Sequence, residues 1–147
     1  MSPTRRPTYL RAPSLGLVLV GAMVGVAGRE GLSLAVPDVG GVPVVVPVVN
    51  VVGAFLLGYL YEALTRSGAG PATASRLKLL LGTGFCGGFT TYSSLATDTA
   101  VLLDQARWDL GAVYALGTVL VGAAATVGGI ALGARLHPRA TPTEDTP

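Results

Sequence analysis

The sequence predicts an all-α membrane protein with four transmembrane helices, and three observations support this fold class. Half of the 147 residues are hydrophobic and only 12% are charged, whereas about a quarter of the residues of a soluble domain are charged. The charged residues gather at the ends of long apolar runs instead of being spread along them. Four such runs are present, each with the roughly 20 residues that a helix needs to cross a bilayer.

The four runs form one predicted transmembrane domain, residues 14–136, between two polar tails. The tail of residues 1–13 contains three arginines and three prolines, and the tail of residues 137–147 is rich in proline and threonine. Segments of this composition bury too little apolar surface to fold, so we expect disordered tails. No clear small-residue cleavage site follows the first apolar run, so we expect that run to be retained as a span.

The first predicted span, residues 14–34, carries small residues for packing and a charged pair near its far end. Gly21 and Gly25 form a GxxxG motif, which lets helices approach closely in a bilayer. Arg29 and Glu30 follow, and an ionisable side chain is costly in a membrane unless it is paired or near the interface. Two interpretations remain open: an interfacial Arg–Glu pair, or an arginine that caps carbonyls of a broken helix or makes an anion vestibule positive.

The second predicted span, residues 44–64, has one strongly polar side chain at its middle, that of Asn50. A side-chain amide both donates and accepts hydrogen bonds and stays neutral at every pH. Asn50 therefore fits an interhelical hydrogen bond that fixes the packing, and it fits equally well a donor that faces a permeating anion.

The third apolar run, residues 77–103, is too long and too polar for a simple span. At ~1.5 Å per residue it would be about 40 Å long, more than a ~30 Å hydrocarbon core needs. The run contains Gly87 and Gly88, followed by Thr90 and Thr91. We predict that the helix breaks near the two glycines. Backbone at membrane depth must find hydrogen-bond partners, so such a break is tolerated only inside protein or beside a polar path. The interrupted part of this run is therefore the predicted functional centre.

The fourth predicted span, residues 110–136, shows two stripes of residues. At i, i+4 and i+8 a helix presents a single face, and these positions are Tyr114, Thr118 and Gly122. A second stripe of small residues favours close helix packing and consists of Ala125, Gly129 and Gly133.

Enzymatic and nucleic-acid functions lack candidate residues in this sequence. There is no phosphate-binding glycine motif, no Ser/His/Asp arrangement, no pair of carboxylates in a cleft and no basic patch interleaved with aromatic residues. The single cysteine, Cys86, excludes an intrachain disulfide framework. The sequence therefore indicates a membrane protein that is not an enzyme.

Three motifs, taken in order, resemble those of the Fluc/CrcB family of fluoride channels. They are GAMVGVAGRE at residues 21–30, PVVNVVGAFLLG at residues 47–58 and GFCGGFTTYSSLATD at residues 84–98. The resemblance covers about residues 15–136. It implies a prokaryotic plasma-membrane channel that exports fluoride passively. It further implies an antiparallel dimer of four-helix subunits with the third helix broken, two pores along the subunit interface, and a structural Na⁺ at the dimer centre.

The resemblance also implies which residues form the site. The carbonyl oxygens of Gly87 and Thr90 would hold the Na⁺. Fluoride is small and strongly hydrated, so its pore must replace lost water with neutral donors and with the positive edges of aromatic rings. The implied pore residues are Asn50, Tyr92, Leu95, Tyr114 and Thr118, and the implied supporting residues are Arg29 and Asp98. Family members have phenylalanine at the positions of Tyr92 and Leu95, so this chain keeps only one of the two rings.

Basic residues are distributed unevenly over the two sides of the predicted bundle. One side carries only Arg107, with Arg29 left inside the first span, and the other side carries eight residues: Arg5, Arg6, Arg11, Arg66, Arg76, Lys78, Arg135 and Arg139. The positive-inside rule then predicts that both termini are cytoplasmic. A chain that inserts in a single orientation cannot form an antiparallel dimer with itself, so our hypothesis is a dimer with an oppositely oriented paralogue. An antiparallel homodimer is the alternative.

Two other functions remain open. A small multidrug-type, proton-coupled exporter is also built from four-helix antiparallel dimers, but it needs a membrane-embedded carboxylate, and neither Glu30 nor Asp98 is well placed for that role. A non-conducting partner subunit would fit the loss of an aromatic ring at Leu95.

Overall fold

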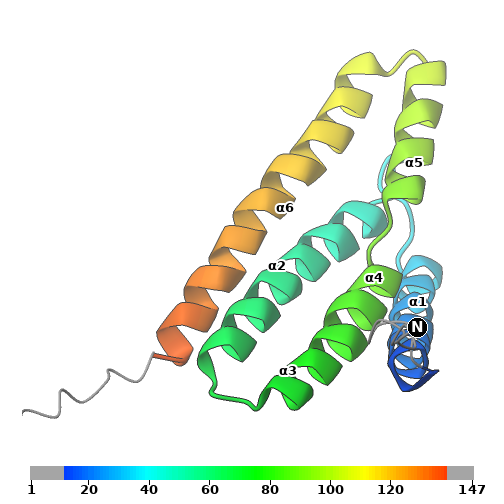
Figure 1. Ribbon diagram of the computed structural model, residues 1–147. Coiled ribbons are helices and arrows are strands. Elements are labelled where there is room, and N and C mark those ends of the chain that lie inside the picture. The colour runs from blue at the N-terminus through cyan, green and yellow to red at the C-terminus, as the bar shows by residue number, and fades with distance from the viewer. Residues whose placement is uncertain (1–11, 139–147) are drawn as a thin grey trace, which may run out of the picture.

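The computed structural model describes residues 12–138, and they form a bundle of membrane-length helices (Figure 1). The elements are α1 (Ala12–Ala35), α2 (Val45–Arg66), α3 (Pro71–Leu77), the π-helix η2 (Lys78–Cys86), α4 (Gly87–Phe89), α5 (Tyr92–Asp104) and α6 (Trp108–Leu136). By length and composition, α1, α2 and α6 are each able to cross a membrane. Residues 1–11 and 139–147, the greater part of the two predicted tails, lie outside the described residues.

The predicted fold class, an all-helical membrane protein with a bent third helix, is confirmed. Helices α1, α2 and α6 begin and end within two residues of the predicted spans. The third span consists of α3, η2 and α4 in unbroken succession, followed by an extended step and α5 (Figure 1). It begins at Pro71, which occupies the first turn of α3, a position that proline favours because its missing N–H has no helical partner there.

The break lies near Gly87 and Gly88, as predicted, but two residues further along the chain. Both glycines are helical, and the chain becomes extended at Thr90 (φ −85°, ψ 155°) and Thr91 (φ −149°, ψ 116°). A Cβ atom on Gly88 would lie 2.5 Å from the carbonyl oxygen of Ala22, so this glycine serves close packing of the third span on α1. The β-branched threonines suit the extended conformation that they adopt.

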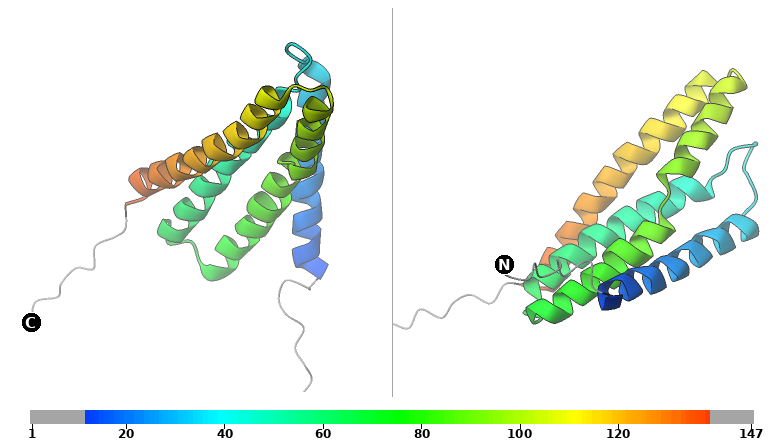
Figure 2. Two further views of the ribbon diagram at one scale, coloured as in Figure 1. Left: turned by 90° about the horizontal axis from the view of Figure 1, so that it is seen from above. Right: turned by 45° about the vertical axis from the view of Figure 1, so that its right-hand side comes forward.

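The helices pack as two pairs, α2 with α6 and α1 with the η2–α4 segment (Figure 2). Each pair is in close backbone contact at glycines. A Cβ atom on Gly21 would lie 2.1 Å from the carbonyl oxygen of Leu80, and one on Gly129 would lie 2.2 Å from that of Phe55. The predicted small-residue stripes are thus the packing surfaces of their helices. The outward faces of α1 and α6 are apolar and exposed, as a bilayer or a partner helix requires.

The loop between α1 and α2 contacts the turn between α5 and α6. It turns at Gly40 and Gly41, whose φ angles of 59° and 74° favour glycine, and Arg107 Nη2 donates to the Gly40 carbonyl (3.3 Å). This loop carries the Pro43 carbonyl to Tyr114.

Candidate ion-conduction site at the helix break

Thr90 and Thr91 form the break, because one ends α4 and the other starts α5. The backbone N–H and the hydroxyl of Thr90 both donate to the Cys86 carbonyl, over 3.0 and 2.8 Å. The hydroxyl oxygen of Thr91 accepts the Ser94 N–H (3.2 Å) and so caps the N-terminus of α5. The two threonines therefore satisfy part of the hydrogen bonding that the interrupted helix has lost.

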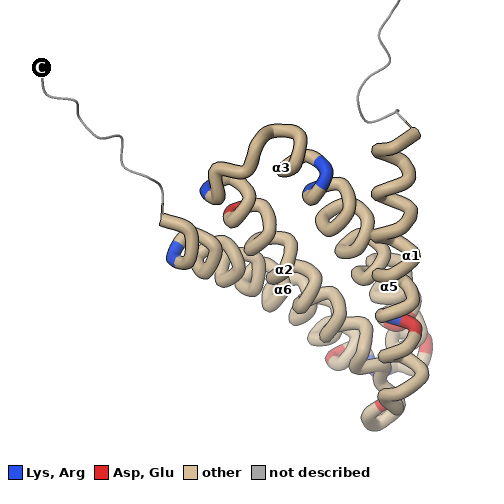
Figure 3. Tube along the Cα trace, turned by 90° about the horizontal axis from the view of Figure 1, so that it is seen from below, with Lys and Arg blue, Asp and Glu red and all other residues tan. Residues whose placement is uncertain are grey.

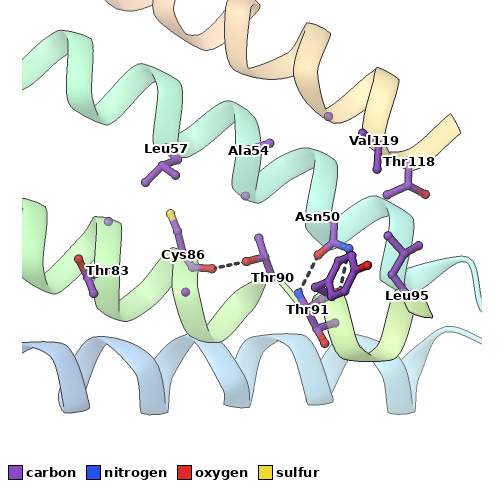
Figure 4. A pocket seen from close by; sticks show the side chains of 15 residues that line it. Asn50, Ala54, Leu57, Thr83, Cys86, Thr90, Thr91, Leu95, Thr118 and Val119 are labelled. Atoms are coloured by element: carbon purple, nitrogen blue, oxygen red, sulfur yellow. Dashed lines mark hydrogen bonds between the residues drawn. The ribbon is translucent and has the colours of Figure 1, made fainter. Parts of the chain in front are cut away.

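Asn50 of α2 holds the break in place across the bundle. Its Nδ2 donates to the Thr91 carbonyl (3.0 Å), and its Oδ1 accepts the Thr91 N–H (2.7 Å), as the dashed lines in Figure 4 show. The interhelical hydrogen bond, one of the two open interpretations of Asn50, is thus present. One of the two Nδ2 hydrogens is left, since each hydrogen bond uses only one. Asn50 also lines a cavity of about 570 Å³ beside the break, so a free donor and the break share this cavity.

At the break, the carbonyls of Gly87 and Thr90 lose the N–H donors that they would have in a continuous helix. In a continuous helix the Gly87 carbonyl would accept the Thr91 N–H, but that N–H donates to Asn50. The Thr90 carbonyl would accept the Ser94 N–H, which donates to the Thr91 hydroxyl. Both residues line the same cavity as Asn50. Neutral oxygen donors freed at a broken helix suit a hard alkali cation, so these two residues fit the predicted Na⁺ site. Among the described residues, no group of three His, Cys, Asp or Glu side chains could hold a metal.

The two residues predicted in place of the phenylalanine pair lie in different surroundings. Both line the cavity at the break, but the Tyr92 side chain is 82% exposed, whereas Leu95 is 5% exposed and packs against Val46, Leu102 and Tyr114. The ring of Tyr92 therefore lies at the open rim of the cavity, and the side chain of Leu95 belongs to the hydrophobic core of the bundle.

The hydroxyl groups of Tyr114 and Thr118 form hydrogen bonds within the chain. Thr118 is buried and donates to the Tyr114 carbonyl one turn earlier (2.6 Å). Tyr114 Oη lies 2.8 Å from Asp98 Oδ2 and 2.9 Å from the Pro43 carbonyl. Since a hydroxyl has a single hydrogen, neither group has a spare donor for an anion in this arrangement.

The predicted site residues do not share one cavity. Thr118 lines the cavity at the break, but Tyr114 lines a second cavity of about 430 Å³ on the other side of the α2–α6 pair, which Thr118 also borders. Asp98 is placed next to Tyr114 by its hydrogen bond and borders neither cavity. Thr118 is therefore the residue that the two cavities have in common.

Arg29 contacts both of its predicted partners. Its Nη1 is 2.8 Å from Glu30 Oε1, and its Nε reaches the Gly88 carbonyl at 3.5 Å, close to the upper limit for a hydrogen bond. The arginine side chain is 19% exposed. It therefore brings a positive charge to the end of α4, although it does not line the cavity at the break.

Several residues that line the cavity at the break were not predicted from the sequence: Leu57, Thr83, Cys86 and Val119 (Figure 4). A signal was present for Thr83, which lies four residues before Gly87 and seven before Thr90. Residues at these spacings share one face of a helix. Cys86 and Thr83 belong to η2, and π-helical turns occur frequently at functional sites.

Comparison with known proteins agrees with this architecture. Residues 16–130 match the family described as CrcB-like protein, Camphor Resistance (CrcB). A protein of Leifsonia xyli subsp. xyli named fluoride-specific ion channel FluC 2 is 44% identical over 130 residues, which are 88% of this chain and 90% of that protein. Fluoride-specific ion channel FluC 1 of Mycolicibacterium paratuberculosis is 40% identical over 109 residues, 74% of this chain and 80% of the relative. Fluoride-specific ion channel FluC of Chlorobium phaeobacteroides is 38% identical over 115 residues, 77% of this chain and 86% of the relative. These names describe channels and not enzymes, as the sequence indicated, and the chain belongs to the CrcB family of multi-pass membrane proteins.

Proposed function

We propose that this protein is a fluoride-specific channel subunit that lets cytoplasmic fluoride leave the cell passively. The observation that carries the proposal is the bidentate hydrogen bonding of Asn50 to Thr91. These two hydrogen bonds stabilise the extended step in the third span. The remaining Nδ2 hydrogen of Asn50 is a neutral donor for the cavity beside the break. The names of the relatives supply the ion, because each of the three is called fluoride-specific.

The free Nδ2 hydrogen of Asn50 is the donor that we assign to fluoride in the cavity. A neutral amide replaces part of the ion's hydration shell without the fixed positive charge that would hold the ion too tightly to conduct. The exposed ring of Tyr92 offers its positive edge at the rim of the same cavity. Thr118 contributes a donor only if its hydroxyl turns away from the Tyr114 carbonyl.

A second subunit completes the site in this proposal. The cavity at the break is open on one side, with Tyr92 at its rim, and the apolar face of α6 carries exposed leucines and valines. An antiparallel partner would cover both, and the Gly87 and Thr90 carbonyls of two breaks facing each other would bind Na⁺ between them. Replacing all Na⁺ by a large organic cation during purification should then weaken the dimer.

The charge distribution leads us to propose that the partner is an oppositely oriented paralogue. Among the described residues, the end that contains α3 carries four basic residues, Arg66, Arg76, Lys78 and Arg135, against one acid, Glu62 (Figure 3). The opposite end has two arginines, Arg29 and Arg107, against more acids, which include Glu30, Asp38, Asp104 and Asp109. By the positive-inside rule the basic end, and with it both termini, is cytoplasmic.

Fluoride efflux from liposomes tests the function and the type of dimer together. Efflux that is selective for fluoride over chloride supports the channel, whereas proton-driven export of organic cations would replace it with the exporter. If the chain purified alone forms a stable, conducting dimer, the homodimer is correct and the paralogue is unnecessary. If single substitutions of Asn50, Tyr92 and Thr118 leave the flux of the assembled channel unchanged, the chain is a non-conducting partner.

A further inference from the structure

A groove lies between the start of α1 and the start of the third span, away from the helix break. Its volume is about 460 Å³, and its lining includes Leu17 of α1, Ser75 and Arg76 of α3, and Leu79 of η2. Helix α1 packs along η2 and α4 but scarcely touches α3. The two segments therefore diverge towards the basic end of the molecule (Figures 1 and 3), and the groove fills the space between them.

The lining of the groove combines polar and apolar groups. Arg76 and Ser75 supply a guanidinium group and a hydroxyl group, while Leu17 and Leu79 supply apolar walls. Helix α1 begins at Ala12, so Leu17 lies about 8 Å further along its axis at ~1.5 Å per residue. With the basic end of the bundle at the membrane surface, a groove of this depth would reach from the level of the lipid headgroups into the region of the acyl chains.

Arg76 differs from Arg66 and Lys78 because no acid and no aromatic ring among the described residues contacts it. Arg66 is paired with Glu62, and Lys78 Nζ lies 5.2 Å from the centre of the Tyr61 ring. The charge of Arg76 is thus available to a ligand, and it lies at the end of the molecule where basic residues exceed acidic ones.

We propose that this groove binds one anionic phospholipid. The phosphate would contact Arg76 and Ser75, and an acyl chain would lie against Leu17 and Leu79. Basic pockets between transmembrane helices recognise anionic headgroups in this way. The preceding segment of this chain, residues 1–11, is a poor occupant because it carries three arginines and no acid, which the charge of Arg76 would repel. The inference does not depend on the ion that the channel conducts.

Lipid retention by the full-length protein tests the proposal. The protein is purified in detergent and exposed to equal amounts of phosphatidylglycerol and phosphatidylcholine, and bound lipid is counted by native mass spectrometry. We expect the wild type to retain phosphatidylglycerol preferentially. One basic side chain near an anionic headgroup is worth roughly a fivefold change in binding, so R76Q should lose roughly that factor. S75D should lose at least as much, because it places a negative charge beside the phosphate.

The matched control is R135Q, which removes one exposed arginine from the same end of the molecule outside the groove. It should keep the wild-type retention. Equal losses in R76Q and R135Q would overturn the proposal in favour of general surface charge. It would also be overturned by equal retention of both lipids in the wild type, or by inorganic phosphate displacing the lipid at equal concentration. Because Ser75 and Arg76 are exposed, neither substitution is expected to unfold the protein, and unchanged thermal unfolding in phosphatidylcholine verifies this.

Discussion

Replacing Asn50 by alanine should cost this protein both stability and conduction. The substitution removes the hydrogen bonds of 3.0 and 2.7 Å to Thr91. The Thr91 N–H is left without a partner, whereas the Thr91 carbonyl, at the N-cap of α5, keeps the first hydrogen bond of that helix. An unsatisfied buried group costs roughly 1–3 kcal/mol, and Thr91 is only partly buried, which favours the lower end, about 1 kcal/mol. That free energy corresponds to roughly a fivefold change in a conformational equilibrium.

Two measurements check this prediction, and both use the channel complex in the form in which it assembles in the cell. Fluoride efflux from liposomes should fall by at least about fivefold in N50A, because the broken conformation becomes less populated and the donor in the cavity is lost. The temperature of thermal unfolding should fall as well. The control is T65V, which removes a hydroxyl that bonds the Tyr61 carbonyl within α2 (2.7 Å). Neither residue lines the cavity at the break, so T65V should leave the efflux near the wild-type value. An N50A channel with wild-type efflux and stability would refute the role assigned to Asn50.

Three further predictions concern packing, the pore and the cation. G21A should destabilise the protein by about 1–3 kcal/mol, because its Cβ would lie 2.1 Å from the Leu80 carbonyl oxygen. G16A on the same helix has open space around the new Cβ and should leave the temperature of thermal unfolding unchanged. Equal effects of the two substitutions would contradict the packing. T118V should lower fluoride efflux several-fold if the hydroxyl turns towards the ion, and unchanged efflux would mean that its hydrogen stays on the Tyr114 carbonyl. Exchange of Na⁺ for a large organic cation should shift the protein from dimer to monomer in size-exclusion chromatography; a dimer that survives full exchange would exclude a structural cation.

The membrane spans could be predicted from the sequence because a bilayer imposes a simple rule on composition and length. Runs of about 20 apolar residues ended by charges or prolines are enough to place α1, α2 and α6. Excess length and hydroxyl content likewise indicated that the third span is interrupted. These are properties of a segment by itself, and they need no knowledge of its neighbours.

The exact position of the break depends on contacts that are distant in sequence. Gly88 is helical because it packs on Ala22 of α1, and the extended step at Thr91 is held by Asn50, 41 residues away. Neither pairing follows from local composition. The two interpretations of Asn50 could not be separated from the sequence for the same reason, since only the position of Thr91 distinguishes them.

The surroundings of the predicted pore residues could not be predicted from the sequence alone either. Tyr92 and Leu95 are three residues apart, yet one is exposed and the other is buried in the core. Tyr114 and Thr118 share a helical face, as their spacing predicted, but the hydrogen bonds of Tyr114 direct it to Asp98 and Pro43. Which donors remain free depends on these partners, and the partners are set by tertiary packing.

A measurement of ion selectivity tests the proposed function most directly. The measurement is efflux of fluoride and of chloride from liposomes that contain the channel, purified as it assembles in the cell, with N50A in parallel. The proposed function predicts rapid fluoride efflux, no chloride efflux, and loss of the fluoride efflux in N50A. Equal efflux of both anions, or no fluoride efflux from channels shown to be intact dimers, would contradict it.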